Sequence, residues 1–564
     1  MIFKSKFPKL DIPNIDLPQY CFMEGKRRYC QSRNRLDFAI RDAITGKSMD
    51  IYEIESMSIQ FASGLVNILG FKKDEVVALF SPNSIYFPIV SFGTMMAGGS
   101  ITLANHTYTS RELLHQLADS NTKVIATESG LLDTVLKAIK MGNLDIPISK
   151  IILIDINPTH TKHGATHIEH FYSNAPVSIS RIESKTDAET RVAAIPYSSG
   201  TTGVAKGVML THKNLITAVI MNSCFSVYDN WFDRKNNPPV YICALPFYHI
   251  YGFNSILNLG IANSIGIIVM QRFQIESFLS HIEQYKAEFV NLVPPLVTQI
   301  SKYPNITNYN LSSIKAIRTG SAPTGKDSLA RFYSIFKNIG VVRAYGLTET
   351  SPTVVQTLKN HPNDGSSGTL HSNVEAKVVD IDGNQLGYNQ VGELCFRGPS
   401  IMKGYLNNPE ANAKSFDSEN FFHTGDIGFV DEKENFHITG RIKELIKYKG
   451  FQVPPAELEG LLLKNDNVAD SAVIGVYDGE QDTELPKAYI VLASKHSHLS
   501  KIKKDQIAQE AKAWLETQVA PHKKLRGGIS VIDEIPKNPS GKILRHILKD
   551  MDTENASTIH KSKL

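Results

Sequence analysis

The chain has 564 residues, too many for a single hydrophobic core, so we expect one large domain and at least one smaller domain. Hydrophobic residues make up 42% of the chain and charged residues 21%, as is usual in globular proteins. The net charge of +4, from 60 basic and 56 acidic residues, is nearly balanced and argues against a nucleic-acid partner.

Five cysteines are scattered along the chain without Cys-x-x-Cys spacing. This argues for a reducing compartment and against a disulfide framework or a zinc site. Residues 76–105 and 236–271 form long uncharged stretches, but prolines and amide side chains that hydrocarbon does not tolerate interrupt both. We therefore expect buried units of an α/β core there and no transmembrane segment.

From the amino terminus to about residue 190, apolar runs alternate with amphipathic segments. Residues 76–81, 100–104, 123–127 and 151–156 predict strands, and residues 85–96 and 110–117 predict helices. This alternation predicts a mostly parallel sheet that helices cover on both faces.

A polar loop then separates the apolar runs at residues 192–195 and 208–210. It contains Ser198, Ser199, Gly200, Thr201, Thr202, Gly203 and Lys206. Glycine lets successive backbone N–H groups turn inward, while the hydroxyls and the lysine add donors and charge, as a phosphate-binding loop requires. The spacing differs from the GxxxxGK[ST] P-loop, so a Walker-type ATPase is not indicated.

The order and length of this loop resemble the signature loop of the adenylate-forming superfamily, which includes acyl-CoA and aryl-CoA ligases, firefly luciferase and peptide-synthetase adenylation domains. The resemblance implies an α/β fold with a large multi-layered N-terminal domain and a small, mobile α+β C-terminal domain. It implies ATP, Mg²⁺ and coenzyme A as cofactors or co-substrates. It also implies that the loop residues bind the nucleotide and that Lys206 is catalytic.

An aromatic segment at residues 244–252 contains His249 and Tyr251. Taken alone, His249 is typical of a core histidine beside aromatic rings. In the resembled family, however, a histidine in this motif lies beside the carboxylate to be activated, and the aromatic side chains wall the acyl pocket. The resemblance therefore implies that His249 is catalytic and contacts the acid, and that Tyr251 also contacts the acid.

Two predicted strands run into turns at residues 318–323 and 344–350, where ligands bind in open α/β sheets. The first turn, with Ala322, resembles the family segment that flanks the adenine. In the second turn, the resemblance implies that Tyr345 stacks on the base beside Gly346, that Thr348 contacts phosphate, and that Glu349 holds Mg²⁺ as a catalytic residue. Carboxylate oxygens are suitable ligands for this ion.

The His-Thr-Gly-Asp motif at residues 423–426 ends in Asp426, whose carboxylate can accept hydrogen bonds from both ribose hydroxyls. Arg441 begins a basic segment that resembles the hinge between the two domains of the family. The resemblance implies that Arg441 also reaches the ribose and that Lys443 is the pivot. Many aryl-CoA ligases carry aspartate where this chain has Gly440, so the hinge departs from the family there.

Further along the same segment, the resemblance implies that Lys449 and Gly450 border the tunnel for the pantetheine arm of coenzyme A. It also adds Lys447 and Gln452 to the catalytic residues.

Beyond the hinge, residues 454–464 and 504–519 predict helices, and residues 471–476 and 487–492 predict strands. This compact α+β unit ends in a Pro- and Gly-containing loop around Lys542. In the resembled family, the matching lysine bridges the substrate carboxylate and the α-phosphate. We expect an N-terminal domain at residues 1–440, a C-terminal cap at 441–550 and an unfolded, flexible tail at 551–564.

The chain ends in Ser562-Lys563-Leu564, which matches the peroxisomal targeting signal. The tripeptide predicts a peroxisomal location and an import receptor as a partner.

Together these motifs predict an ATP-dependent acid–CoA ligase resembling 4-coumarate-CoA ligase, which converts a small carboxylic acid through an acyl adenylate to its CoA thioester and releases AMP and pyrophosphate. A luciferase-like oxygenase acting on a luciferyl adenylate is an alternative. The presence of Glu349, Asp426 and Lys542 argues against a non-catalytic binding protein. The absence of an attached carrier domain argues against a peptide-synthetase module.

The acid stays open between medium-chain or long-chain fatty acids and aryl acids such as phenylpropanoids. Many plant 4-coumarate-CoA ligases have Gln-Gly before the Tyr-Gly motif and Ala-Gly after the glutamate. This chain has Arg343-Ala344 and Thr350-Ser351 at those places, where Ala344 is expected to contact the acid. The changes add bulk or charge at the expected acyl pocket, so the resemblance does not extend to coumarate itself.

Overall fold

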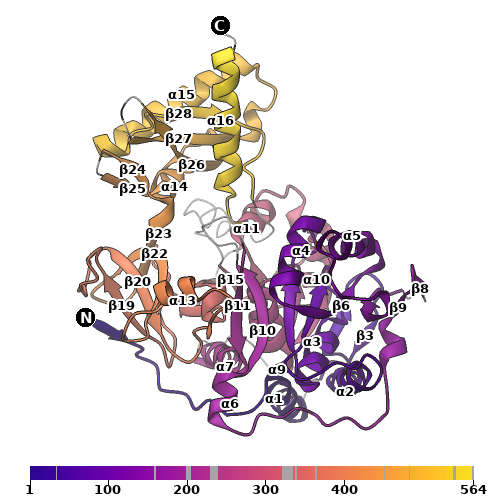
Figure 1. Cartoon of the computed structure of the whole chain (residues 1–564). Coiled ribbons are helices and arrows are strands. Elements are labelled where there is room, and N and C mark those ends of the chain that lie inside the picture. Colours follow the sequence, from indigo (N-terminus) through magenta and orange to yellow (C-terminus); the bar gives the residue numbers. More distant parts are fainter. Residues whose placement is uncertain are drawn as a thin grey trace.

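The structure is a computed structural model that describes residues 1–32, 35–157, 161–198, 205–228, 239–320, 335–336, 339–361, 365–449, 451–479, 481, 483–537 and 541–561. It has a large N-terminal domain and a smaller C-terminal domain, drawn above it in Figure 1. This is the fold class that the sequence predicts.

The strands expected in the first part of the chain lie at the centre of one large sheet. β4 (Val76–Phe80) pairs in parallel with β5 (Ser100–Ala104) on one side and with β6 (Thr122–Thr127) on the other, and β5 also pairs in parallel with β10 (Val192–Ser198). Within the described residues, the strand order is β21 (Gly404–Tyr405), β11 (Lys206–Thr211), β10 (Val192–Ser198), β5 (Ser100–Ala104), β4 (Val76–Phe80), β6 (Thr122–Thr127), β7 (Ile151–Leu153), β9 (Ala165–His167) and β8 (Thr161–Lys162).

The helices expected at the same part of the chain are α3 (Phe87–Met96) and α4 (Ser110–Asp119). All residues of α3 are buried, which explains why this uncharged stretch resembles a membrane span in the sequence. α4 begins at a capping box in which the side chains of Thr109 and Glu112 bond each other's backbone N–H groups. Within the described residues, no helix has the length and apolar character needed to span a bilayer.

Two further sheets carry the middle of the N-terminal domain. One has the order β12 (Val240–Cys243), β13 (Gly266–Val269), β2 (Ile40–Asp42) and β3 (Ser48–Met49) in the described part of the chain. The other runs β14 (Phe289–Leu292), β15 (Ala316–Thr319), β16 (Gly340–Gly346), β17 (Thr353–Gln356) and β18 (Thr369–Leu370). β14, β15 and β16 are parallel, so their carboxyl ends lie at the same edge of the sheet.

An antiparallel sheet closes the N-terminal domain on the side facing the C-terminal domain. Its described strands are β1 (Ile2–Lys4), β19 (Glu375–Val379), β20 (Gly392–Arg397), β22 (Phe422–Val430) and β23 (Phe436–Arg441). β1, at the start of the chain, pairs with β19 and so ties the amino terminus to this sheet (Figure 1).

The remaining helices of the N-terminal domain cover these sheets. They are α1 (Leu17–Gln31), α2 (Ile51–Asn67), α5 (Leu132–Gly142), α6 (Lys185–Thr190), α7 (His212–Tyr228), α8 (Ile250–Gly252), α9 (Leu259–Ala262), α10 (Ile275–Tyr285), α11 (Pro294–Ser301) and α13 (Pro409–Ser415). A π-helical segment, Phe253–Asn258, joins α8 to α9 without a break.

The C-terminal domain has a hydrophobic core of its own. α14 (Pro455–Leu462) and α15 (Lys501–Gln518) pack on β26 (Val468–Asp478), β27 (Thr483–Leu492) and β28 (Gly528–Val531), beside the hairpin of β24 (Ile446–Tyr448) and β25 (Phe451–Val453). The core includes Ile446, Leu458, Val473, Ile490 and Leu515. The expected helices and strands of this domain are confirmed, while the boundary at residues 440 and 441 stays a prediction.

Two sequence expectations are wrong. The strand expected at residues 151–156 ends at Leu153. The tail expected to be unfolded from residue 551 instead continues α16 (Arg545–Lys561). Asp552 anchors this helix, because it forms an ion pair with Lys487 and accepts a hydrogen bond of 2.9 Å from the Tyr489 hydroxyl. A polar sequence alone does not reveal such tertiary contacts.

Candidate active site

The ends of the expected phosphate-binding loop are fixed by a hairpin. β10 and β11 are antiparallel, and Ser198 lies opposite Lys206 where the two strands meet the loop. The loop residues Ser199, Gly200, Thr201, Thr202 and Gly203 lie outside the described residues, as do Ala322 and Gly450. The pairing of Ser198 with Lys206 nevertheless places both expected site residues at the mouth of the loop.

Glu349 lies next to this mouth. Its Oε1 accepts a hydrogen bond of 3.0 Å from Ser198 Oγ and one of 2.9 Å from Tyr405 Oη. The Lys206 ammonium lies 4.9 Å from the centre of the Tyr405 ring. Glu349 is only 6% exposed and belongs to a short 3₁₀ turn, Thr348–Thr350, that also carries Thr348. The expected catalytic residues Lys206 and Glu349 are thus brought together by Ser198 and Tyr405.

A buried carboxylate that accepts bonds from neutral hydroxyls, and to which no lysine or arginine of the described residues is bonded, suits a hard divalent cation. Ser198, Glu349 and Tyr405 meet this description, and the hydroxyl of Thr348 stands one residue from Glu349. The residues present therefore fit Mg²⁺.

The expected adenosine contacts form a second group. Asp426 Oδ2 accepts a hydrogen bond of 2.7 Å from Tyr345 Oη, and Asp426 Oδ1 forms an ion pair of 2.7 Å with Arg441 Nε. Burial raises the pKa of Asp426, while Arg441 and Tyr345 act in the opposite direction. Gly346 follows Tyr345 and packs closely against the backbone of Pro352. A Cβ at this position would lie 1.7 Å from the Pro352 carbonyl oxygen, so there is no room for a side chain.

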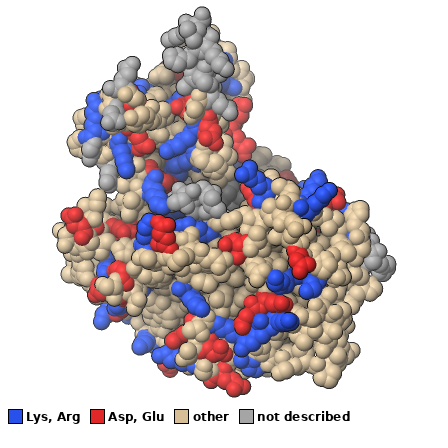
Figure 2. Space-filling model, in the orientation of Figure 1, with Lys and Arg blue, Asp and Glu red and all other residues tan. Residues whose placement is uncertain are grey.

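Lys542 approaches the same group from the C-terminal domain. Burial is the main cause that lowers its pKa, and the charge of Arg441 adds to this effect, while Glu444 and Asp426 act against it. Lys542 therefore lies within range of the charges of Asp426 and Arg441. Figure 2 shows Lys and Arg side chains gathered on this face where the two domains meet.

The expected acid-binding residues lie deeper in the N-terminal domain. His249 caps α8, with its Nδ1 accepting a hydrogen bond of 3.3 Å from the Tyr251 N–H, and burial lowers its pKa to about 4. The Tyr251 hydroxyl donates to Asn291 Oδ1 and to the Arg318 carbonyl, both at 3.3 Å. Because its pKa is lowered to about 4, His249 is neutral at physiological pH. Ala344 precedes Tyr345 on β16 and lies opposite Gln356.

Arg318 is a feature that the sequence analysis did not identify as functional. Its side chain is 1% exposed, and its guanidinium carbon lies 5.6 Å from the centre of the Tyr251 ring. Nη2 donates to Asn222 and Thr353, but within the described part of the chain Nε and Nη1 have no hydrogen-bond partner. A buried cation with two unmet N–H groups is costly unless a ligand or water completes it.

The hinge residues are not part of either group. Lys443 lies in a short 3₁₀ turn, Ile442–Glu444, and its side chain is exposed. Lys447 and Lys449 are also exposed, and their backbone N–H groups donate to Glu484 and Thr483 of the C-terminal domain. Gln452 pairs with Lys447 across β24 and β25. Figure 1 places this hairpin on the side of the C-terminal domain away from α16.

Two more contacts escaped the sequence analysis. Tyr405 comes from an edge strand far from the other motifs, and no local pattern marks it. Arg545, three residues after Lys542, bonds Glu459 at 2.6 Å and Glu444 at 3.2 Å. It therefore joins the Lys542 segment to α14 and to the hinge turn. Its place in the expected loop motif was a signal that could have found it.

The two-domain fold and the side chains of this site define an enzyme of the adenylate-forming class. The AMP-binding enzyme family matches residues 33–406, and the AMP-binding enzyme C-terminal domain matches residues 457–542. The chain belongs to the AMP-binding enzyme family, and within it the chain is a CoA ligase related to the 4-coumarate-CoA ligases.

Two of the similar proteins are 4-coumarate-CoA ligases. That of Narcissus pseudonarcissus (4-coumarate-CoA ligase 1) is 38% identical over 559 residues, covering 97% of this chain and 96% of the relative. That of Vanilla planifolia is 38% identical over 561 residues, with the same coverage. Among solved structures, ATP-bound MatB from Rhodopseudomonas palustris superimposes with a TM-score of 0.78 at 25% identity, covering 94% of this chain and 98% of that chain.

Proposed function

We propose that this CoA ligase activates its acid as an acyl adenylate at the junction of the two domains, and then transfers the acyl group to coenzyme A. The observation that carries the proposal is the ion pair of 2.7 Å between Asp426 and Arg441, whose charges also act on the partly buried Lys542 of the C-terminal domain. A lysine from one domain beside nucleotide-binding side chains of the other can act on the reacting phosphate only while the domains are closed.

In the first half-reaction, the acid carboxylate attacks the α-phosphorus of ATP and pyrophosphate leaves. Two anions must approach each other, so positive charge from Lys542 and Lys206 is the main requirement. Tyr345, Asp426 and Arg441 would hold the adenosine in place. Mg²⁺, when bound near Glu349, would neutralise charge on the triphosphate.

In the second half-reaction, the thiolate of coenzyme A attacks the carbonyl carbon of the acyl adenylate and AMP leaves. We propose that the C-terminal domain turns about Lys443 between the two halves, since the hairpin of β24 and β25 lies on the side of the C-terminal domain away from α16, with Lys447 and Lys449 exposed. The turn would withdraw Lys542 and bring the hairpin of β24 and β25, with Gly450, to the thiol tunnel.

For the acid, we propose an aryl acid that carries a polar or ionised group at the end remote from the reacting carboxylate. The support is Arg318, whose guanidinium lies over the Tyr251 ring and whose Nε and Nη1 have no hydrogen-bond partner among the described residues. A hydroxyl or carboxylate oxygen could complete the hydrogen bonds of Arg318, whereas the methyl end of a fatty acid could not.

We also propose that Ser562-Lys563-Leu564 directs the enzyme to peroxisomes through the import receptor. The support is the sequence match alone. Fusion of residues 545–564 to a fluorescent protein tests it, and the same fusion ending at Lys561 is the control.

The proposed activity is tested with MgATP, coenzyme A and a panel of acids, following pyrophosphate release and thioester formation separately. The panel runs from hexanoate to palmitate and includes benzoate, cinnamate, 4-coumarate and terephthalate. Thioester formation with the 4-substituted aryl acids supports the proposal. Thioester formation with fatty acids alone contradicts the proposed acid, and pyrophosphate release without any thioester contradicts the second half-reaction. Light emission with luciferin would favour the oxygenase alternative.

A further inference from the structure

Asp426 stands on a bulge of β22. Glu393 of β20 lies opposite Ile427, and Cys395 lies opposite His423. Leu394 alone therefore separates the two paired positions on β20, whereas Thr424, Gly425 and Asp426 separate them on β22. Since the bulge inserts two extra residues next to an expected binding site, it re-aims the side chain at its end.

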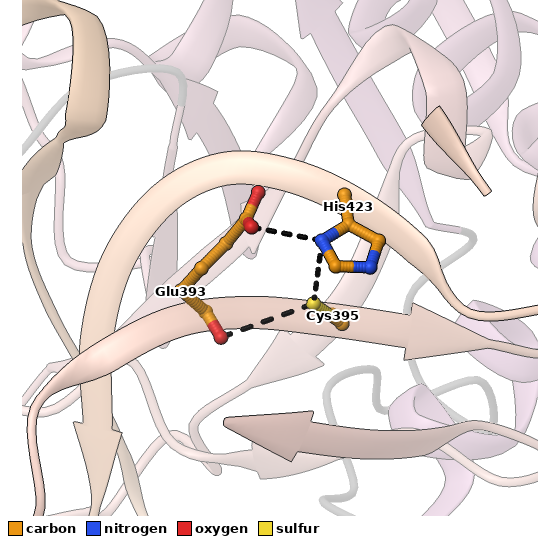
Figure 3. Close-up of side chains that lie close together, drawn as sticks. All are labelled: Glu393, Cys395 and His423. Atoms are coloured by element: carbon orange, nitrogen blue, oxygen red, sulfur yellow. Dashed lines mark hydrogen bonds and ion pairs between the residues drawn. The ribbon is translucent and has the colours of Figure 1, made fainter. Parts of the chain in front are cut away.

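The backbone and side-chain groups of this bulge need partners, because a bulge leaves the ladder. Glu393 supplies two of them. Its Oε1 accepts a hydrogen bond of 2.8 Å from the Gly425 N–H, and its Oε2 accepts one of 2.8 Å from His423 Nδ1. Figure 3 shows the side chains of Glu393, Cys395 and His423 pointing toward one another.

Thr424 satisfies the rest of the bulge. Its hydroxyl donates to the Leu394 carbonyl at 2.7 Å and accepts from the Asp426 N–H at 2.9 Å. Gly425 has a φ of +70°, which a residue with a Cβ rarely adopts. On the β20 side, the direction of Asp426 therefore depends on Gly425 and on the bonds that Glu393 and Thr424 make, while on the other side Asp426 pairs with Arg441 of β23.

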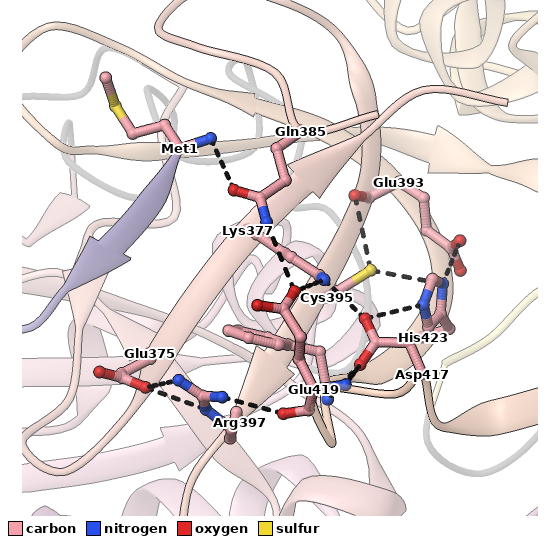
Figure 4. A network of polar contacts seen from close by, with 11 residues as sticks. Met1, Glu375, Lys377, Gln385, Glu393, Cys395, Arg397, Asp417, Glu419 and His423 are labelled. Carbon is pink, nitrogen blue, oxygen red and sulfur yellow. Dashed lines mark hydrogen bonds and ion pairs between the residues drawn. The ribbon is translucent and has the colours of Figure 1, made fainter. Parts of the chain in front are cut away.

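The far side of His423 is held as well. His423 Nε2 lies 3.6 Å from Asp417 Oδ2, and Asp417 in turn bonds Lys377 at 2.6 Å. Figure 4 shows this network continuing across the sheet to Glu419 and Arg397. Because the sheet anchors His423 from both sides, the start of the bulge is fixed.

The same side chains could be taken for a metal centre, since the ligand atoms of Glu393, Cys395 and His423 lie within 4.8 Å of one another. Their hydrogen bonds favour another role. The Glu393 carboxylate is engaged by Gly425 and His423, and burial raises the pKa of the Cys395 thiol, which opposes the thiolate that a metal requires.

We propose that Glu393 is a positioning residue for nucleotide binding, which acts by holding the bulge that aims Asp426 at the ribose. The inference rests on the proposed role of Asp426. Without an acceptor, the Gly425 N–H would be left unmet, and the bulge would relax toward the regular ladder. Asp426 would then lose its alignment with Tyr345 and Arg441.

The test is calorimetric titration of the full chain with AMP, which reports binding by folded molecules and needs no acid or coenzyme A. We expect Glu393→Ala to raise the Kd for AMP by about 10-fold to 100-fold, the effect of one or two unmet hydrogen bonds. Glu393→Gln should stay within about 3-fold of the wild type, because its amide oxygen can still accept from the Gly425 N–H.

Glu375→Ala is the matched control, because Glu375 lies in the same sheet and pairs with Arg397 instead of the bulge. Its Kd for AMP should equal that of the wild type. If Glu393→Ala does not fold, Thr424→Val replaces it, with the same expected rise in Kd.

An equal Kd for the wild type and Glu393→Ala, with binding lost in Asp426→Ala, overturns the inference and leaves the role of Asp426 standing. Unchanged binding in Asp426→Ala, or no binding of AMP by the wild type, overturns both. A loss in Glu393→Ala that Glu393→Gln does not restore also overturns the inference, because the proposed contact needs only an acceptor.

Discussion

Arg441 Nε lies 2.7 Å from Asp426 Oδ1, and the two residues are register partners across β22 and β23. Asp426 is buried, so the ion pair is partly shielded from water. Replacing Arg441 by methionine would leave the buried Asp426 carboxylate with Tyr345 as its one hydrogen-bond partner among the described side chains. We expect this variant to raise the pKa of Asp426 further and to weaken AMP binding by at least about 10-fold at pH 7.

Calorimetry with AMP between pH 5.5 and 8.5 checks this prediction. Binding by Arg441→Met should improve more steeply with rising pH than binding by the wild type, because the phosphate of AMP, which itself titrates near about pH 6, affects both proteins alike. A variant whose affinity is low at every pH would show that Arg441 contacts the nucleotide without tuning Asp426.

Loss of the proton from the Lys542 ammonium group should limit the adenylation rate at alkaline pH. Burial and Arg441 lower the pKa of Lys542 below its usual 10.5, so the ammonium form is lost at a lower pH than in water. Pyrophosphate release in the first half-reaction should therefore fall as the pH rises, with an apparent pKa below 10.5. Lys542→Arg should be slower at neutral pH but should keep its rate to higher pH, because the guanidinium stays charged. If pyrophosphate release by Lys542→Arg falls at the same alkaline pH as in the wild type, the titrating group is not Lys542.

Arg318 should set the preference for substituted acids. For Arg318→Met, we expect the ratio of kcat/KM for 4-coumarate to that for cinnamate to fall by about 10-fold or more, and likewise for terephthalate against benzoate. Arg41→Met is the control, because Arg41 also lies against an aromatic ring, Phe38, in another sheet. Equal losses for each acid and its unsubstituted parent would mean that Arg318 only stabilises the fold.

Two buried histidines should make stability fall in mild acid. Burial lowers the pKa of His212 and of His371 to about 3, whereas each takes up a proton near pH 6.5 when unfolded. Their contribution to stability is present above pH 6.5 and is lost as the pH falls toward 3. Between pH 7.5 and 5.5, the free energy of unfolding should drop by about 1.4 kcal/mol for each histidine.

Denaturant unfolding at the two pH values measures this drop. His371→Leu should remove the part of this drop that His371 causes and should lower the stability at pH 7.5 only slightly, because neither ring nitrogen of His371 has a hydrogen-bond partner among the described residues. His498→Leu, at an exposed position, should leave the drop unchanged. A drop as large in His371→Leu as in the wild type would contradict the assignment.

The sequence predicts the fold class and the central strands because buried strands and capped helices leave local signals. Residues 76–80 and 100–104 read as strands, and the Thr109–Glu112 capping box starts α4 where a helix is expected. The prediction of an unfolded tail was wrong because Asp552 is held by contacts with Lys487 and Tyr489, which lie more than sixty residues away in the sequence.

The candidate site was predictable as far as its residues lie in local motifs. Ser198, Tyr345, Glu349, Asp426 and Arg441 were all predicted in this way, and the structure adds that Ser198 bonds Glu349 while Asp426 bonds Tyr345 and Arg441. Tyr405 and Arg318 were missed because their importance comes from contacts between distant strands. The role of Glu393 was hidden for the same reason, since the bulge appears only when β20 and β22 are paired.

The central claim is that Lys542 serves the adenylation half-reaction alone. The most direct test compares the wild type with Lys542→Ala in two assays, pyrophosphate release from MgATP with the acid, and thioester formation from supplied acyl adenylate and coenzyme A. The account predicts that the variant loses pyrophosphate release by at least about 100-fold, while its thioester formation stays close to that of the wild type. Undiminished pyrophosphate release by Lys542→Ala would contradict it.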